Sequence, residues 1–327
     1  MFENLWSSIT EGIRAKIFSS IDPILNDISS GLLGAIKSII EWVFSAYNDL
    51  VCDKAVSLLQ MRPEEAFDGK GWEVISALNT TFVAIGSTLM IIFWLIGIFQ
   101  DSIDIRLRLS VDSFLKQLFR LVMGEALVTY SVNLLQVFFS LPVKLMSRFS
   151  GDYHVAFESN ALASLEDLHW GNIWNADGTA IVEESNTNLG WVLLLFLIGL
   201  FLFVAVLCTA FVILYTAFIR MFKVLIIIPY GALAMSTVSS TNSTFMGTTF
   251  SYLKYAFSSI MESVTMLIAL YLGTYIISNS GLNLAGLGLG DSYGEAVGWM
   301  VQSIILFCVA AGAVKESGQI TNRIFGS

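Results

Sequence analysis

The stretch from Ser185 to Ile219 contains no Asp, Glu, Lys or Arg and is dominated by large apolar residues. A helix needs roughly 20 consecutive apolar residues to cross a bilayer, and this run is longer than that. At about 1.5 Å per residue, a continuous helix here would exceed a hydrocarbon core of about 30 Å. We therefore expect a membrane-spanning helix that is tilted or that projects beyond the bilayer.

The composition of the whole chain points the same way. Hydrophobic residues make up 55% of the 327 residues and charged residues only 13%, whereas a soluble domain carries roughly 25% charged residues. We predict an all-α, polytopic helical membrane protein with about five spans. The predicted spans are Trp72–Gln100, Leu121–Leu141, Asn186–Ile219, Tyr252–Ser278 and Glu295–Val314.

The segment from Lys223 to Phe250 differs from the other apolar segments. It carries Pro229 and Gly231 inside an apolar stretch, and Ser or Thr then occupies nine of the fourteen residues from Ser236 to Thr249. Broken helices at membrane depth require cover from protein or a water-filled cavity. We predict a helix broken at Pro229–Gly231 that forms a re-entrant hairpin, with a full sixth span as the alternative. The Ser/Thr residues could line a hydrated vestibule, satisfy freed backbone groups or form a polar turn.

The placement of Lys and Arg divides the chain into four parts. Residues 1–71 carry helical apolar stripes too short to span and are expected to be extracytoplasmic; they lie on a bilayer, pack against partner subunits or form a small soluble bundle. Residues 72–148 hold two spans joined by a basic, cytoplasmic connection. Residues 149–188 form an acidic outer loop, and residues 189–327 hold the remaining core spans together with the broken element 223–250.

Two acids fall inside apolar segments. An ionisable group in a span is costly and usually faces the bundle interior, a cavity or an ion path, which singles out Glu125 and Glu262. They could relay protons or ions. They could also form structural pairs, Glu125 with Arg120, and Glu262 with Lys254 or with a neighbouring subunit.

The sequence contains no pattern typical of an enzyme. It has no nucleophile elbow, no phosphate-binding loop and no Cys/His spacing of a metal site, so we expect no catalytic residue, cofactor or metal. Contact with nucleic acid needs Lys and Arg. A basic cytoplasmic rim is formed by Arg106, Arg108, Lys116 and Arg120. The candidates for such contact are Arg106, Arg108 and Lys116 of this rim, together with Arg220 and Lys223; the alternative for each is that it only sets the topology.

One ordered pattern resembles a known family. A long apolar helix ends in Arg220-Met-Phe-Lys223, and Ile-Ile-Ile-Pro229-Tyr-Gly231-Ala-Leu-Ala and the Ser/Thr stretch follow it. Tyr252-Leu-Lys254 and Ile260-Met-Glu262 come next. Over about residues 190–275 this resembles the TrbL-like family of polytopic membrane subunits of type IV secretion and conjugation systems, most of all its members from Gram-positive bacteria.

The resemblance implies a function and partners. It implies a channel or scaffold subunit in the bacterial cytoplasmic membrane that forms a ring-like homo-oligomer and helps to move single-stranded DNA with attached protein. Secretion ATPases and envelope or pilus components would be its partners. The family core maps here to Arg220, Lys223, Pro229, Gly231, Lys254 and Glu262. The alternatives are an ion- or proton-coupled transporter using Glu125 and Glu262, and a scaffold that conducts nothing.

Overall fold

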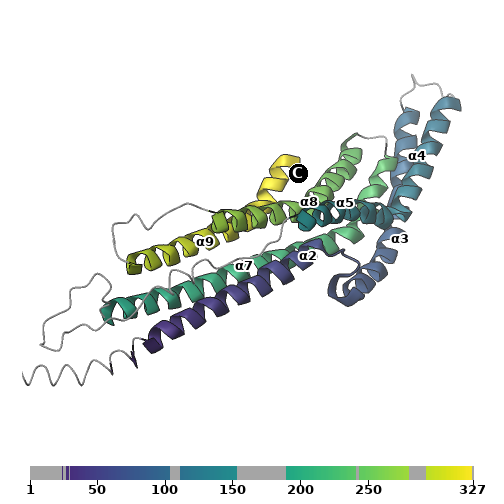
Figure 1. Ribbon diagram of the computed structural model, residues 1–327. Helices are drawn as coiled ribbons and strands as arrows, with labels where there is room; N and C mark the ends of the chain where they lie inside the picture. The colour runs from purple at the N-terminus through teal and green to yellow at the C-terminus, as the bar shows by residue number, and fades with distance from the viewer. Residues whose placement is uncertain are drawn as a thin grey trace, which may run out of the picture. The chain divides into compact units, whose positions relative to one another are not determined.

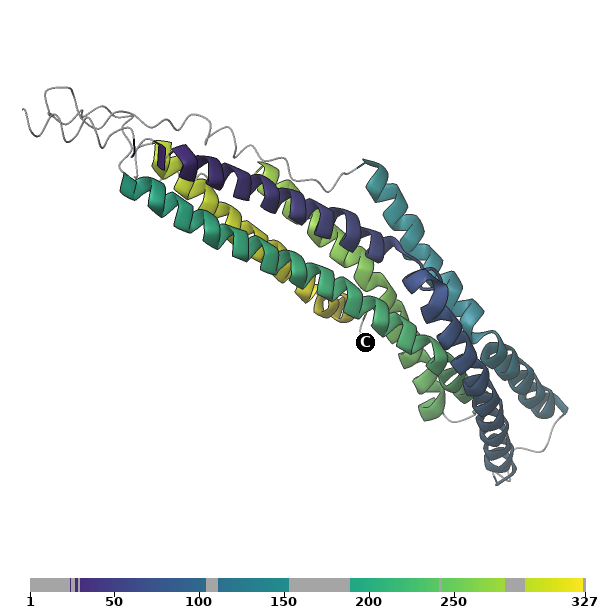
Figure 2. The same ribbon diagram turned by 90° about the horizontal axis from the view of Figure 1, so that it is seen from below.

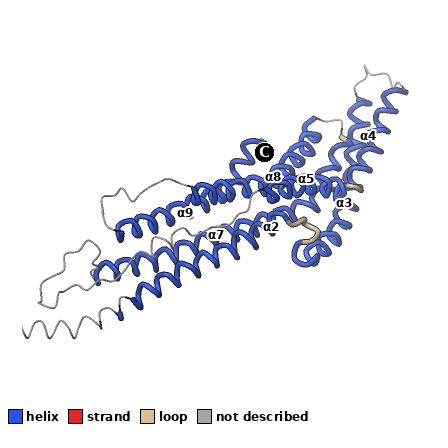
Figure 3. The backbone as a smooth tube through the Cα atoms, viewed as in Figure 1, coloured by secondary structure: helices blue, strands red, loops and turns tan. Residues whose placement is uncertain are grey.

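A computed structural model describes residues 24, 27, 28, 30–103, 111–152, 189–240, 243–279 and 292–325. Within these ranges every regular element is helical and none is a strand (Figure 3). The predicted all-α class is therefore confirmed for the part of the chain that is described. The acidic loop after Asp152 and the Gly-rich segment after Asn279 lie outside it.

Inside the described ranges, the helices follow one another with few irregular residues between them (Figure 1). A helix over residues 30–47 continues into a π-helical turn. The elements from there on are η1 (Asn48–Ala55), α2 (Val56–Gln60), η2 (Ala66–Gly69), α3 (Lys70–Ile103), α4 (Val111–Thr129), α5 (Ser131–Asp152), α7 (Leu189–Ser236), η3 (Thr237–Ser239), α8 (Ser243–Asn279) and α9 (Ser292–Phe325).

Four segments of the described chain are long and apolar enough to cross a membrane: Ala66–Gln100, Val192–Ser239, Phe245–Gly273 and Val297–Phe325. The pair Phe114–Thr129 and Ser131–Arg148 passes the same test together and raises the number to 5. This agrees with the prediction of about five spans in a multi-pass membrane protein.

The segment that contains the predicted second span, Leu121–Leu141, is bent. Its two halves, α4 and α5, meet at Tyr130 with an angle of 62°. Hydrogen bonds from Tyr130 N–H to the Ala126 carbonyl (2.9 Å) and from Leu134 N–H to the Tyr130 carbonyl (3.0 Å) continue through the bend. Val128 of α4 packs beside Ala232, whereas Leu135 of α5 packs with Ile228, so each half follows its own part of α7.

The predicted break at Pro229–Gly231 is wrong, because α7 continues through Pro229 to Ser236. Tertiary contacts hold the helix there. Pro229 is buried, and the Tyr252 hydroxyl donates a hydrogen bond of 2.8 Å to the Ile227 carbonyl. A Cβ on Gly231 would lie 3.1 Å from that hydroxyl oxygen, so Gly231 serves close packing rather than a turn.

The chain turns instead in the Ser/Thr-rich segment, where α7 gives way to η3 and an extended Ser240. Contacts between Thr237 and Thr249, Ile227 and Tyr252, and Lys223 and Glu262 pair α7 with α8 in antiparallel order. The segment 223–250 is thus a helical hairpin whose turn lies at the Ser/Thr residues.

The chain divides into two compact units, and each combines separate stretches of sequence. The first unit consists of Met1–Cys52, Val155–Phe211 and Leu272–Ala311. The second consists of Asp53–His154, Val212–Tyr271 and Gly312–Ser327.

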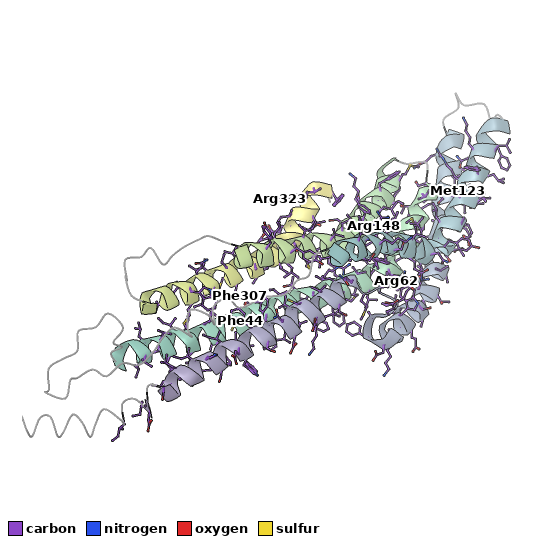
Figure 4. All side chains as sticks on the ribbon, viewed as in Figure 1. Phe44, Arg62, Met123, Arg148, Phe307 and Arg323 are labelled. Carbon is purple, nitrogen blue, oxygen red and sulfur yellow. The ribbon has the colours of Figure 1, made fainter. Side chains whose placement is uncertain are left out.

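In the first unit, the helix over residues 30–47 lies along the N-terminal part of α7 and along α9 (Figure 2). Its buried stripe is Ile36, Ile40, Val43 and Tyr47. Phe44 faces Phe307 with ring centroids 5.8 Å apart (Figure 4), and Trp42 stacks on Phe203 at 5.4 Å. The predicted amphipathic stripe is therefore present, and it is covered by helices of the same chain.

In the second unit, α3 and α4 lie side by side and contact η3, while α5 packs against α7 (Figure 1). Two apolar clusters form its interior. The larger is built on Leu135, Phe139, Met221, Val224, Leu225, Ile228, Ala256 and Ile260. The smaller, which we call the α4–η3 cluster, is built on Met90, Val128, Ala232 and Met235. All the candidate site residues that are described lie in this unit.

Candidate functional site

Three charged residues meet inside the second unit, and we call them the buried charge centre: Arg220, Lys223 and Glu262. The Lys223 ammonium donates a hydrogen bond of 3.1 Å to the Glu262 carboxylate, and the two side chains are 28% and 12% exposed. Lys223 also lies 5.4 Å from the centre of the Tyr255 ring. The sequence singled out both ends of this ion pair, but the partners that it offered for Glu262 were Lys254 and a neighbouring subunit.

Arg220 is the most deeply buried member, at 6% exposure. Its two terminal nitrogens lie 3.5 Å from the backbone carbonyls of Leu59 in α2 and Ile260 in α8, while its Nε has no hydrogen-bond partner within the described residues. These contacts are long, so Arg220 depends on the nearby Glu262 carboxylate for compensation of its charge. The centre therefore ties together α2, α7 and α8.

The last part of α9 closes the site from another side. A Cβ placed on Gly318 would lie 2.6 Å from Glu262 Oε1, so the carboxylate occupies the space that a side chain would need. The Ser258 hydroxyl donates to Asn322 Oδ1 at 2.6 Å, and the hydroxyls of Thr265 and Thr321 lie 2.9 Å apart. These contacts form a polar seam between α8 and α9.

Sequence reasoning missed the seam, although a signal for it exists. Ser258, Glu262 and Thr265 recur at i, i+4 and i+7, which places them on one helix face. Gly318 and Asn322 are also four residues apart, with Thr321 between them. Small and polar residues at such spacings inside apolar helices are typical of close helix contacts.

We expect Gly318→Ala to destabilise the protein by about 1–3 kcal/mol, the usual cost of overpacking, because the new methyl group must displace the Glu262 carboxylate. The measurement is the midpoint of thermal aggregation in mild detergent, followed by size-exclusion chromatography. Gly312→Ala is the matched control on the same helix, since a Cβ there meets nothing within 4 Å. Equal midpoints for the two variants would contradict the tight fit at Glu262.

Glu125 occupies a different setting, on an exposed face of α4. The Ser87 hydroxyl donates to its carboxylate at 3.2 Å, and the Thr129 hydroxyl lies at 3.5 Å. Arg120, the partner expected from the sequence, makes no ion pair with it in the described part of the chain. Glu125 lies in a groove of about 690 Å³ whose other walls are largely apolar, lined among others by Met90, Ile91, Leu121 and Val122.

The Ser/Thr residues after α7 form a buried turn. The hydroxyls of Thr237 and Thr249 lie 2.7 Å apart, and both bond to the Ala234 carbonyl. Ser239 lies 3.0 Å from the Met90 carbonyl of α3 and 2.9 Å from the Ser236 carbonyl of α7. Of the three roles left open by the sequence, the structure matches the polar turn, which satisfies the last carbonyls of α7.

Lys223, a member of the charge centre, also borders a groove of about 760 Å³ that is lined by Tyr230, Tyr252 and Tyr255. The remaining predicted residues are not members of the charge centre. Lys116 and Arg120 line a shallower groove of about 590 Å³ on α4. Lys254 is exposed on α8. Arg106 and Arg108 fall outside the described residues. Among the residues that are described, no group of three or more His, Cys, Asp or Glu could hold a metal ion.

Comparison with known proteins adds no relative. No family model matches the chain, and neither the curated proteins nor the solved structures contain a significant match.

Proposed function

We propose that this chain is one subunit of a multi-copy membrane assembly, and specifically a channel or scaffold subunit of a conjugative type IV secretion system. In this role it helps single-stranded DNA and attached protein to cross the bacterial cytoplasmic membrane. The resemblance of residues 190–275 to the TrbL-like subunits supports the specific assignment. The position of Glu125 supports the more general one.

The exposed position of Glu125 in an apolar helix pair is the observation that carries the proposal. Glu125 is an exposed acid in a helix pair that is apolar enough to enter a membrane, and its hydrogen-bond partners among the described residues are the hydroxyl groups of Ser87 and Thr129. A carboxylate facing lipid is expensive, and acids in such segments face protein or water. In a single copy, none of the described residues covers the groove that contains Glu125. This favours an assembly in which a partner subunit fills the groove or an aqueous lumen borders it.

The buried charge centre argues against the transporter alternative. Glu262 forms a salt bridge with Lys223, and its carboxylate packs closely against Gly318. These contacts favour a structural role for Glu262. The groove that contains Glu125 does not include Glu262. A relay that uses both acids needs a shared hydrated path, and the described residues form no pocket that contains both.

Residues on α4 offer a place for the substrate or for cytoplasmic partners. Lys116 is exposed and Arg120 half-buried on the stretch of α4 that precedes Glu125. Phosphate contacts depend on such cations. In this proposal the basic rim contacts the DNA–protein substrate or the secretion ATPases, while envelope or pilus components bind on the outer side.

The test is affinity purification of the tagged full-length chain in mild detergent at native expression level, with mass spectrometry of the partners. We expect an oligomer that brings down secretion ATPases and envelope subunits, and loss of DNA transfer when the chain is deleted. Recovery of the tagged chain as a lone monomer, together with undiminished DNA transfer by cells from which the chain is deleted, would overturn the proposal.

A further inference from the structure

Two opposite charges are exposed on the second unit without a charged partner. Glu125 emerges from α4, and Lys254 emerges from α8 within the apolar segment Phe245–Gly273. Neither takes part in an ion pair within the ranges that the structure describes. Each leaves a charge on a surface that is otherwise rich in exposed apolar side chains, such as Val122 at 58% and Phe250 at 60% exposure. Uncompensated charges on such surfaces are costly.

The two charges lie at nearly the same level of the helix stack. Gly124 of α4 and Thr249 of α8 both touch the turn after α7, through Ser239 and Thr237 respectively. From that turn, α4 and α8 run in the same direction along α7. Glu125 comes one residue later and Lys254 five residues later, which corresponds to rises of about 1.5 Å and 7.5 Å. The difference of about 6 Å is within the reach of the two long side chains.

Residues close in sequence to Glu125 and to Lys254 pack into the α4–η3 cluster. Val128, one turn after Glu125, belongs to the α4–η3 cluster, and Leu253, next to Lys254, packs against the same cluster. Glu125 and Lys254 therefore lie beside residues of the same apolar cluster, but each is exposed on a different helix, α4 or α8. Two such charges in one chain that do not pair with each other can each be satisfied by the opposite charge of a different neighbouring copy.

We propose that Glu125 of one copy pairs with Lys254 of the next copy, so that the α3–α4 groove of each subunit receives α8 of its neighbour. The surface around Lys254 suits this fit. Gly247 and Ser251 precede Lys254 at seven and three residues, and all three are exposed, which gives α8 a narrow face that can approach the groove closely. The proposed contact is head-to-tail, because the acid and the base of each copy meet two different neighbours, and repetition about a closed rotation gives a ring.

This inference rests on the proposed function only in requiring a homo-oligomer. It does not depend on the identity of the cargo or of the secretion partners.

The first experiment is cross-linking in native membranes. The starting chain has Cys52, Cys208 and Cys308 replaced by Ala, so that the introduced cysteines alone react; Cys208 and Cys308 are exposed. A disulfide needs Cα atoms within about 7 Å, and a Glu–Lys pair spans more than that, so a bifunctional thiol reagent joins the cysteines. We expect Glu125→Cys/Lys254→Cys chains to give a ladder of dimers, trimers and larger species.

Mixing experiments distinguish head-to-tail contacts from symmetric ones. Chains with Glu125→Cys alone, or Lys254→Cys alone, should give no cross-linked species. Co-expression of these two single variants should give dimers and nothing larger, because each chain then carries one reactive position. Dimers from a single-Cys variant alone, or a double-Cys variant that stops at dimers, would overturn the head-to-tail arrangement. Tyr215→Cys/Lys254→Cys is the negative control. Tyr215 is 65% exposed on α7 but takes no part in the proposed contact, so this variant should give no ladder.

The second experiment is a charge exchange read out by oligomer size in detergent. Glu125→Lys and Lys254→Glu should each lower the oligomer fraction at least several-fold by placing like charges opposite each other. The double variant should restore most of it. Failure of the double variant to recover, alongside an absent cross-link ladder, would overturn the proposal.

The same experiments separate this inference from the proposed function. A ladder and charge rescue in a protein that purifies without secretion subunits would uphold the ring contact and refute the conjugative role. Recovery of secretion ATPases with an oligomer that neither cross-links at these positions nor responds to the charge exchange would uphold the role and refute this contact.

Discussion

Glu262→Leu is expected to destabilise the second unit by about 3–5 kcal/mol, the usual cost of removing one partner from a buried ion pair. The carboxylate is 12% exposed, accepts a hydrogen bond of 3.1 Å from Lys223 and compensates the more deeply buried Arg220. Its removal leaves two cations between apolar helices. The measurement is the loss of monodisperse protein in size-exclusion chromatography after a temperature series in mild detergent.

A matched control and a compensating variant make this prediction specific. Glu316→Leu changes an exposed acid on α9 and should shift the midpoint little. Replacing Arg220, Lys223 and Glu262 together by Met should recover much of the lost stability, because apolar residues of similar volume commonly replace a buried charge cluster at little cost. A triple variant that stays as unstable as Glu262→Leu would show that the centre contributes more than mutual compensation of charge.

The triple variant also tests what the charges do. A stable chain without them that still supports DNA transfer would assign the buried charge centre a purely structural role. A stable chain that has lost transfer would make the centre part of the transport function.

The sequence predicted the helical class and the number of spans because both depend on local properties. An uncharged apolar run as long as Ser185–Ile219 indicates a membrane-spanning helix. A charge inside an apolar segment, such as that of Glu262, must face protein or water and not lipid. These inferences need no knowledge of which helices are neighbours. They singled out Glu262, while the family resemblance and the placement of cations singled out Arg220 and Lys223, but neither indicated that the three residues form one group.

The partner of Glu262 was missed because the register of an antiparallel helix pair is set by its turn. A turn at Pro229–Gly231 would put residues other than Lys223 opposite Glu262. The observed turn, eight residues nearer the C-terminus at η3, places Lys223 there. Pro229 indicated a break by its local preference, but the Tyr252 hydroxyl at the Ile227 carbonyl and the packing at Gly231 override that preference.

The seam partners on α9 were missed for a related reason. Gly318, Thr321 and Asn322 lie beyond the last predicted span and read as a short polar end of the chain. Only the tertiary arrangement brings them to α8, where Gly318 makes room for a carboxylate 56 residues earlier in the sequence. A helix spacing can suggest that a face is in contact, but it cannot name the element that the face contacts.

Gly86→Ala is the second change with a large expected effect, at about 1–3 kcal/mol or more. A Cβ at Gly86 would lie 2.8 Å from the Ala232 carbonyl oxygen, 3.1 Å from the Ala232 carbonyl carbon and 3.2 Å from Val128 Cγ1. Two of these atoms belong to the backbone of α7, so no side-chain rotation relieves the clash. The helices α3 and α7 must instead move apart, which opens the α4–η3 cluster.

Gly312→Ala provides the contrast within the same unit, because a Cβ there meets nothing within 4 Å and Ala is the better helix former. We expect the melting midpoint of Gly312→Ala to match or exceed that of the parent chain, and that of Gly86→Ala to fall clearly below both. The displacement should also weaken the contact of Ser239 with the Met90 carbonyl, since this contact joins η3 to α3 one turn beyond Gly86. Hydrogen exchange of the η3 amides should therefore rise in Gly86→Ala and stay unchanged in Gly312→Ala. A Gly86→Ala protein with parental stability and parental exchange at η3 would contradict the close approach of α3 to α7.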